Sequence, residues 1–211
     1  MNHDASTSVA LLGDLVDSRA SSDRVALHAR LSDALTLANR RHHPLDALRV
    51  TVGDEFQGVF GTLGDALAAS YTVRLALGDD VRFGIGRGAV SVIDTTGNVQ
   101  DGSAWWSARA AIDDVKKRAR GSHRALRTGL GTAEGMPPAP PTLVAAVELA
   151  DAMLTGLDAE SRAILTLLLH GRPQAQAAEQ IGVSRSAVSQ RVARNGLAIL
   201  ADSLLRLGEA E

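Results

Sequence analysis

Short apolar runs alternate with longer amphipathic segments along the first part of the chain. Residues 8–15 form an apolar run that ends at Gly13-Asp14, which is typical of a buried strand. Residues 22–41 carry apolar side chains close to helical spacing. Residues 48–60 predict two strands that meet at Gly53-Asp54, because such a dipeptide between apolar runs favours a hairpin. The same patterns predict a helix over 63–77, a strand over 81–93, a helix over 103–118 and a strand over 125–130.

The order of these elements, β-α-β-β-α-β-α-β, predicts an α+β fold. We expect a ferredoxin-like core with one extra pair of elements, in which helices cover one face of an antiparallel sheet. Residues 131–141 follow, and four prolines within five residues near their end favour an extended spacer. The sequence therefore predicts a first domain over 1–130, a Pro-rich linker over 131–141 and a second domain over 142–211.

The second domain is predicted to be wholly helical. The apolar spacing indicates helices over 142–155, 159–169, 173–181 and 184–207, the last with a break near Gly196. Gly182 supplies a tight turn, Ser184 is placed to cap the next helix, and Val188 and Val192 face inward. The side chains left outside, which suit contacts to bases and phosphates, are Arg172, Ser184, Arg185, Ser186, Ser189, Gln190 and Arg194.

Residues 158–207 resemble the helix-turn-helix of sigma-factor region four and of LuxR-type response regulators. The resemblance implies binding to double-stranded DNA, with the segment after Ser184 as the recognition helix. A helical bundle used only for packing or dimerisation is the competing interpretation. Arg191 is ambiguous, because it is placed either to contact phosphate or to shield the bundle.

Composition narrows the classes of function. The chain has no cysteine, which excludes disulfides, thiol catalysis and cysteine-type zinc sites. No apolar stretch approaches the roughly 18 residues of a membrane span, so we expect a cytoplasmic protein that does not contact membranes. The net charge of −2 looks unfavourable for DNA, but DNA affinity depends on the local charge of the docking face. Six basic residues lie within 116–127, where they are typical of a solvated helix end.

Polar residues gather where the predicted strands of the first domain end. Asp14 and Asp54 are carboxylates at a strand tip and at the hairpin, and together they predict a site for Mg²⁺ or Mn²⁺. Nearby polar side chains are candidates for binding a nucleotide or another phosphate ligand, namely Asp17, Arg19, Glu55, Gln57, Arg87 and Arg109. The competing interpretation is that these residues only cap helices and build turns.

Four motifs in this domain, GDLVDSR, VGDEFQG, FGIGRG and DGSAWWSAR, resemble the SatD family over about residues 8–130. More distantly, the pattern is similar to the class III nucleotidyl cyclases and the GGDEF cyclases. That similarity implies that Asp14 and Asp54 bind metal ions. The base-reading lysine of such cyclases is missing at Val50 and Thr51, and their later Asn and Arg align with Trp106 and Ala110. These departures favour ligand binding over turnover.

We therefore expect a cytoplasmic DNA-binding transcription regulator whose N-terminal domain binds a nucleotide or phosphate ligand with a divalent metal. A homodimer would place two recognition helices on DNA, and RNA polymerase is a second expected partner. The alternative is an enzyme, a nucleotide cyclase or phosphotransferase whose helical tail serves dimerisation. A third hypothesis is an interaction module without a ligand.

Overall fold

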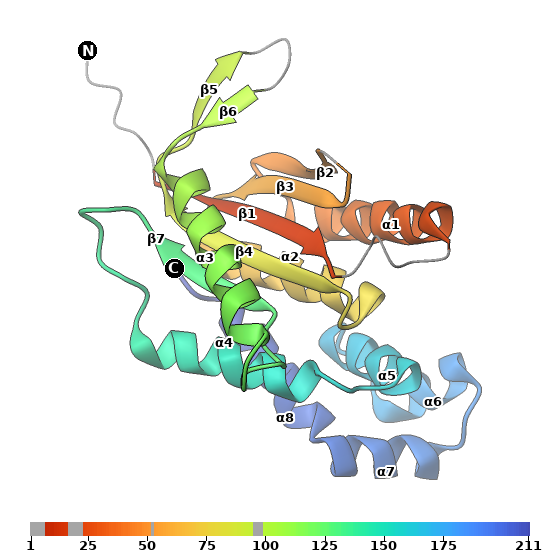
Figure 1. Cartoon of the computed structure of the whole chain (residues 1–211). Coiled ribbons are helices and arrows are strands. Elements are labelled where there is room, and N and C mark those ends of the chain that lie inside the picture. Colours follow the sequence, from red (N-terminus) through yellow and green to blue (C-terminus); the bar gives the residue numbers. More distant parts are fainter. Residues whose placement is uncertain (1–6, 17–22, 52, 95–98) are drawn as a thin grey trace.

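A computed structural model describes residues 7–16, 23–51, 53–94 and 99–211 of the chain (Figure 1). The elements follow in the order β1 (Ser8–Leu15), α1 (Arg24–His42), β2 (Asp46–Val50), β3 (Glu55–Phe60), α2 (Leu63–Leu77), β4 (Val81–Gly88), β5 (Ser91–Asp94), β6 (Val99–Asp101), α3 (Ser103–Ala119), β7 (Thr128–Thr132), α4 (Pro141–Leu154), α5 (Ala159–Leu169), α6 (Gln174–Ile181), α7 (Arg185–Asn195) and α8 (Leu197–Leu207). None of these described helices combines the length and the apolar character needed to cross a bilayer.

The fold is mixed α+β, built on a mainly antiparallel sheet. Its five strands lie in the order β2-β3-β1-β4-β7, in which β1 runs antiparallel to both β3 and β4. The predicted order of elements is found except after residue 88: the single strand predicted over 81–93 is divided into β4 and β5, and β5 pairs with β6 in a small hairpin. The last strand, β7, pairs parallel with β4, because α3 crosses back over the sheet between them. The sheet is therefore not antiparallel throughout.

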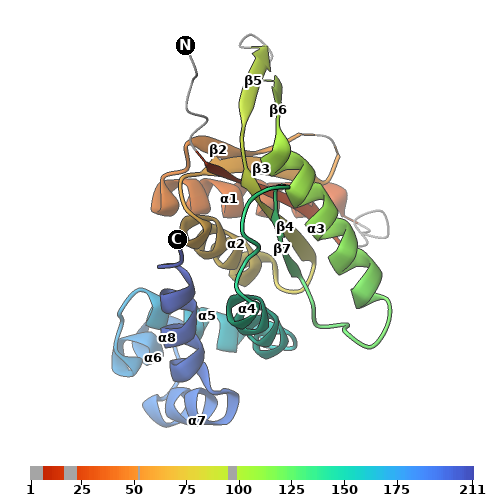
Figure 2. The ribbon, with the colours of Figure 1, turned by 90° about the vertical axis from the view of Figure 1, so that its left-hand side faces the viewer.

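Helices cover both faces of the sheet, so the prediction that they cover one face is wrong. Alternate residues of a strand point to opposite faces. On β1, Val9 and Leu11 pack in the core formed with α1 and α2, whereas Ala10 and Leu12 pack against Ala104 and neighbouring residues of α3. Figure 2 shows α3 on the side of the sheet away from α1 and α2.

Glycines at every second position let α3 lie directly on the sheet. Gly84 and Gly86 of β4, like Gly129 and Gly131 of β7, face the backbone of α3. A Cβ atom at Gly86 would lie 2.2 Å from the carbonyl oxygen of Ala104, closer than real Cβ contacts. This period-two glycine pattern is the physical reason that the second face is covered, because side chains there would hold α3 away.

The C-terminal helices join the same core. The linker predicted over residues 131–141 overlaps the end of β7, which reaches Thr132, and the first residue of α4, Pro141. One cluster of buried side chains nevertheless extends from Leu11 and Leu67 to Ile164 and Leu200. Figure 1 shows α4 and α5 between the sheet and the outer helices α6 and α7. Gly196, where a break is predicted, has a φ of 62° and separates α7 from α8.

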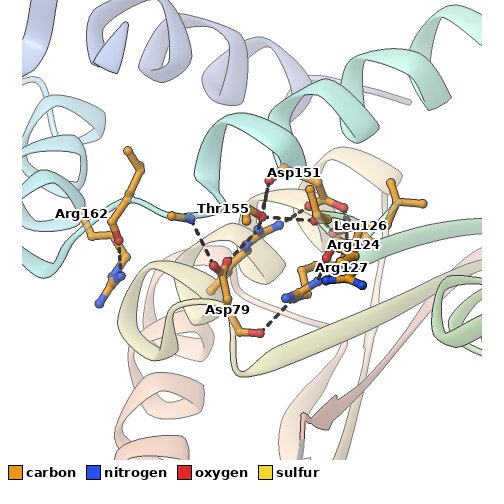
Figure 3. Close-up of polar contacts among 12 residues, drawn as sticks. Asp79, Arg124, Leu126, Arg127, Asp151, Thr155 and Arg162 are labelled. Carbon is orange, nitrogen blue, oxygen red and sulfur yellow. Dashed lines mark hydrogen bonds and ion pairs between the residues drawn. The ribbon is translucent and has the colours of Figure 1, made fainter. Parts of the chain in front are cut away.

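A buried ion pair connects α2 with α4. The Arg74 side chain is 2% exposed and that of Asp151 is fully buried, and the two form an ion pair and a hydrogen bond. Asp151 Oδ2 also accepts hydrogen bonds of 2.7 Å from the backbone N–H groups of Arg127 and Thr128, at the start of β7 (Figure 3). Burial raises the pKa of Asp151, and the Arg74 guanidinium opposes that shift. One carboxylate thus holds α2, α4 and β7 together.

Asp79 and Thr155 complete this network. Arg74 Nη2 donates to Asp79 Oδ1 at 3.1 Å and to Thr155 Oγ1 at 3.0 Å. Asp79 Oδ2 accepts from the N–H of Gly156 at 3.1 Å, just after α4. The buried guanidinium therefore has oxygen acceptors on two sides of the contact, which offsets the cost of removing it from water.

We expect Asp151→Asn to destabilise the protein by about 3–5 kcal/mol, because it leaves the Arg74 guanidinium buried without its carboxylate. Urea unfolding followed by circular dichroism measures the change. Asp202→Asn, on the exposed surface of α8, is the matched control. Equal stability of the two variants would show that the ion pair is not structurally important.

Gly86→Ala is expected to cost about 1–3 kcal/mol, because its Cβ overlaps the backbone of α3 and forces the helix off the sheet. Gly61→Ala is the control, since a Cβ there meets nothing within 4 Å. Thermal unfolding of both variants makes the comparison. A Gly86→Ala protein as stable as Gly61→Ala would contradict the close packing of α3.

Candidate functional site

Two groups of polar side chains were predicted as sites, and the first lies on α6, α7 and the turn between them. Helix α6 is followed by its C-cap residue Gly182, whose φ of 78° is the left-handed conformation that favours glycine. The N–H of Val183 donates to the carbonyl of Ala178 at 3.0 Å. Ala177 and Ala178 are buried, as are Val188 and Val192 on α7. Small and branched apolar residues therefore hold the two helices together.

Helix α7 begins with a capped turn and carries an exposed polar surface. Ser184 Oγ accepts a hydrogen bond of 3.1 Å from the N–H of Ala187, as the sequence predicts. The predicted outward residues are all exposed: Arg172, Ser184, Arg185, Ser186, Ser189, Gln190 and Arg194. Within the described part of the chain, no ion pair or hydrogen bond involves the side chain of Arg185 or Arg194. We refer to all the exposed residues named in this paragraph, including Arg172, which precedes α6, as the α7 surface.

Arg191 turns away from this surface and holds α7 against α5. Its Nη1 donates to Asp158 Oδ2 at 2.7 Å, and its Nη2 donates to Glu160 Oε2 at 2.5 Å. Asp158 also caps α5 by accepting from the N–H of Ser161 at 2.7 Å. The Ser161 hydrogen bonds, followed by the Arg191 interaction, lower the pKa of Asp158 to about 2. Of the two interpretations of Arg191, these contacts favour shielding of the bundle.

The second group surrounds Asp14 on the face of the sheet that α3 covers. Asp14 is 8% exposed, and its Oδ2 lies 2.6 Å from Lys116 Nζ. Arg82 is the residue of β4 that pairs with Asp14, and its Nη1 lies 3.8 Å from Asp14 Oδ1. Glu55 is opposite Asp14 on β3 and receives two hydrogen bonds of 3.0 Å from Arg109. These hydrogen bonds are the main reason that the pKa of Glu55 is lowered. We call these five residues the sheet cluster.

Lys116 and Arg82 were not predicted as members of a site. Lys116 follows Arg109 by seven residues on α3, so the two lie on the same face of the helix, two turns apart. That spacing is a signal present in the sequence. These two side chains reach the carboxylates of β1 and β3 only because α3 lies close to the sheet, which the glycines permit.

The other predicted residues of this domain lie in different places. Asp54 lines a cavity of about 290 Å³ together with Arg24, Val25 and His28 of α1. Gln57 is half-buried on β3, two residues from Glu55 and on the same face of the sheet. Arg87 follows Gly86, which faces α3, and successive residues of a strand point to opposite faces of the sheet. Arg87 therefore lies on the face away from α3 and Arg109. Asp17 and Arg19 lie outside the described residues.

The contacts of Asp14 do not fit a divalent cation in this arrangement. Asp14 Oδ1 is buried and has no hydrogen-bond partner among the described residues, which leaves lone pairs available. However, Lys116 and Arg82 already place positive charge against this carboxylate, and they would repel a metal ion. The described residues contain no group of three or more acidic or histidine side chains that could hold a metal. The predicted Mg²⁺ or Mn²⁺ site stays a prediction.

Comparisons with known proteins extend the resemblance beyond the first domain. No curated protein matches the chain. The model of the SatD family matches residues 8–203, which include α5, α6 and α7 as well as the sheet. Because this match covers nearly the whole sequence, the chain belongs to the SatD family.

Proposed function

We propose that this protein is a DNA-binding transcription regulator in which α6 and α7 form a helix-turn-helix. The observation that carries the proposal is the α7 surface, whose polar side chains are exposed while Val188 and Val192 bind the helix to its neighbours. Arginine and glutamine recognise base edges in the major groove, and serine binds phosphate or bases. A surface of this composition has no role in packing the bundle.

The position of α7 also supports the proposal. Figure 1 shows α7 at the edge of the molecule, on the far side of α5 from the sheet. Its 11 residues span about 16 Å, a length suited to lying in a major groove. Arg185 is the first residue of the helix, where the exposed backbone N–H groups of the first turn also favour phosphate.

The small number of charges on this surface favours a dimer or a protein partner. Arg172, Arg185 and Arg194 are its basic residues, so a single copy neutralises few phosphates and binds DNA weakly. A homodimer doubles the contacts and matches a two-fold symmetric DNA site. Contact with RNA polymerase is the second way to supply the missing affinity.

For the N-terminal part we propose a ferredoxin-like domain that binds a nucleotide or another phosphate ligand. The strand order β2-β3-β1-β4, with α1 and α2 on one face, supports this architecture. The sheet cluster supplies the cations Arg82, Arg109 and Lys116. A phosphate group would compete with Glu55 for Arg109, whose planar guanidinium binds two oxygens at once.

The alternative is a nucleotide cyclase or phosphotransferase. Such chemistry needs carboxylates free to hold metal ions, whereas Asp14 is paired with Lys116. Ligand binding without turnover is therefore the function that these contacts favour.

The double variant Arg185→Ala/Arg194→Ala is expected to weaken binding to bulk double-stranded DNA by about tenfold or more, because it removes two positive charges that neutralise phosphates. Fluorescence anisotropy at several salt concentrations measures the affinity, which should fall as salt rises. Arg206→Ala, an exposed position on α8, is the control and should leave the affinity unchanged. Wild-type protein that shows no salt-dependent binding would refute the proposal.

A thermal-shift series with nucleoside mono-, di- and triphosphates tests the ligand. We expect one of these classes to raise Tm for the wild type, because a ligand that binds only the folded state stabilises it. Lys116→Gln should abolish that rise, whereas Lys117→Gln, the exposed neighbouring position, should keep it.

Repeating the series with Mg²⁺ or Mn²⁺ tests whether the acidic residues bind a metal ion or have only structural roles. A metal-dependent rise that is lost in Asp14→Asn and Asp54→Asn would support the predicted metal site. Product formed from a triphosphate in the same samples would favour the enzyme. A Tm that no nucleotide changes would contradict ligand binding by the sheet cluster.

A further inference from the structure

A cavity separate from both candidate sites lies where the C-terminal helices meet the helices of the sheet domain. Its volume is about 390 Å³, and its walls come from α1 and α2 on one side and from α5 and α8 on the other. This volume is within the range of about 300–1,000 Å³ found for small-molecule sites. Neither the α7 surface nor the sheet cluster contributes a residue to it.

The walls of the cavity are mainly apolar, and two of its charged side chains are exposed. The apolar lining includes Leu37, Ala68, Leu75, Ala76, Leu169 and Leu204. Arg41 and Glu209 also line it, and both are exposed residues. An ion pair that a ligand made with such exposed groups would contribute only about 0–1 kcal/mol.

The polar groups deeper in the wall are uncharged hydrogen-bonding groups. Thr72 Oγ1 donates to the carbonyl of Ala68 at 3.0 Å and also lies 2.9 Å from His42 Nε2. Because the threonine hydrogen is used in the first bond, the second bond requires the proton to be on His42 Nε2. Burial, followed by the charge of Arg41, lowers the pKa of His42, which favours the neutral ring. Nδ1 of this ring is then a hydrogen-bond acceptor.

His170, the residue that follows α5, also lines the cavity but is exposed. Burial lowers its pKa, and the charges of Arg41 and Arg172 lower it further. Asp65 of α2 also lines the cavity, but its carboxylate accepts a hydrogen bond of 2.8 Å from Thr62 Oγ1. An anionic ligand would therefore lose hydration inside the cavity without gaining a buried cation, and the half-buried carboxylate that a cationic ligand would meet, Asp65, is already hydrogen-bonded to Thr62.

We propose that this cavity binds an uncharged, largely apolar small molecule that carries one hydrogen-bonding group. The apolar body contacts Leu75 and Leu169 on opposite walls, and the polar group lies toward His42 and Thr72. A molecule bound here touches α2 and α5 together and stabilises the packing of the C-terminal helices on the sheet domain. The proposal concerns this cavity alone and stands whether or not α7 binds DNA.

Three probes with the same alkyl chain test the chemistry of the site: 1-octanol, octanoate and octylammonium. We expect 1-octanol to raise Tm and to bind about tenfold more tightly than either charged probe, a difference of about 1.4 kcal/mol. Isothermal titration calorimetry on the full chain measures the affinities. Octanoate or octylammonium binding as tightly as 1-octanol would overturn the assigned chemistry.

Variants that fill the cavity test its location. Ala76→Phe on α2 and Leu205→Trp on α8 add bulk from the two sides at exposed lining positions, so one substitution serves if the other disturbs folding. Each should weaken 1-octanol binding by about tenfold or more. Ala163→Phe, an exposed position on α5 outside the cavity, should leave binding unchanged. Unchanged binding in a folded Ala76→Phe or Leu205→Trp protein would place the octanol elsewhere and refute the proposal.

Discussion

The buried ion pair between Arg74 and Asp151 is the interaction that fixes how the two parts of the molecule meet. Removing a guanidinium and a carboxylate from water is costly, and the cost is offset when the two charges pair and most of their other hydrogen-bonding groups find partners. Here those partners come from β7, from the end of α4 and from Asp79 after α2. The geometry is thereby restricted to one arrangement, since a shifted α4 would leave a charge buried alone.

The ion pair fixes the position of α4, and the positions of the later helices follow from it. Helix α4 leads directly through Leu157 into α5, and both contribute to the core that includes α2 and α8. Arg191 then ties α7 to the start of α5 through Asp158 and Glu160. The exposed α7 surface is therefore held in a defined place relative to the sheet. The cavity between α2 and α5 lies within the same contact, so a molecule bound there would act on the packing that positions α7.

The second constraint is the close approach of α3 to the sheet. Because Gly84, Gly86, Gly129 and Gly131 have no side chains, the backbone of α3 rests on β4 and β7. This closeness brings Lys116 and Arg109 to Asp14 and Glu55. Asp14, one of the two carboxylates that resemble metal ligands in sequence, is consequently paired with Lys116 of α3, whereas Asp54 lies beside α1.

Features that depend on neighbouring residues could be predicted from the amino-acid sequence. The cap at Ser184, the left-handed turn at Gly182, the break at Gly196 and the extent of Leu63–Leu77 arise from hydrogen bonds and packing over a few positions, and local pattern predicts them. The outward residues of α7 were predictable for the same reason, because helical periodicity separates them from Val188 and Val192.

Contacts between residues far apart in the chain could not be predicted in this way. Arg74 and Asp151 are 77 positions apart, and nothing in the local pattern of either helix indicates that they pair. The parallel direction of β7, the covering of both faces and the partners of Asp14 likewise depend on how α3 crosses the sheet. The physical reason is that local hydrogen bonds form within one segment, whereas burial of charge and backbone-to-backbone packing require segments that only the folded chain brings together.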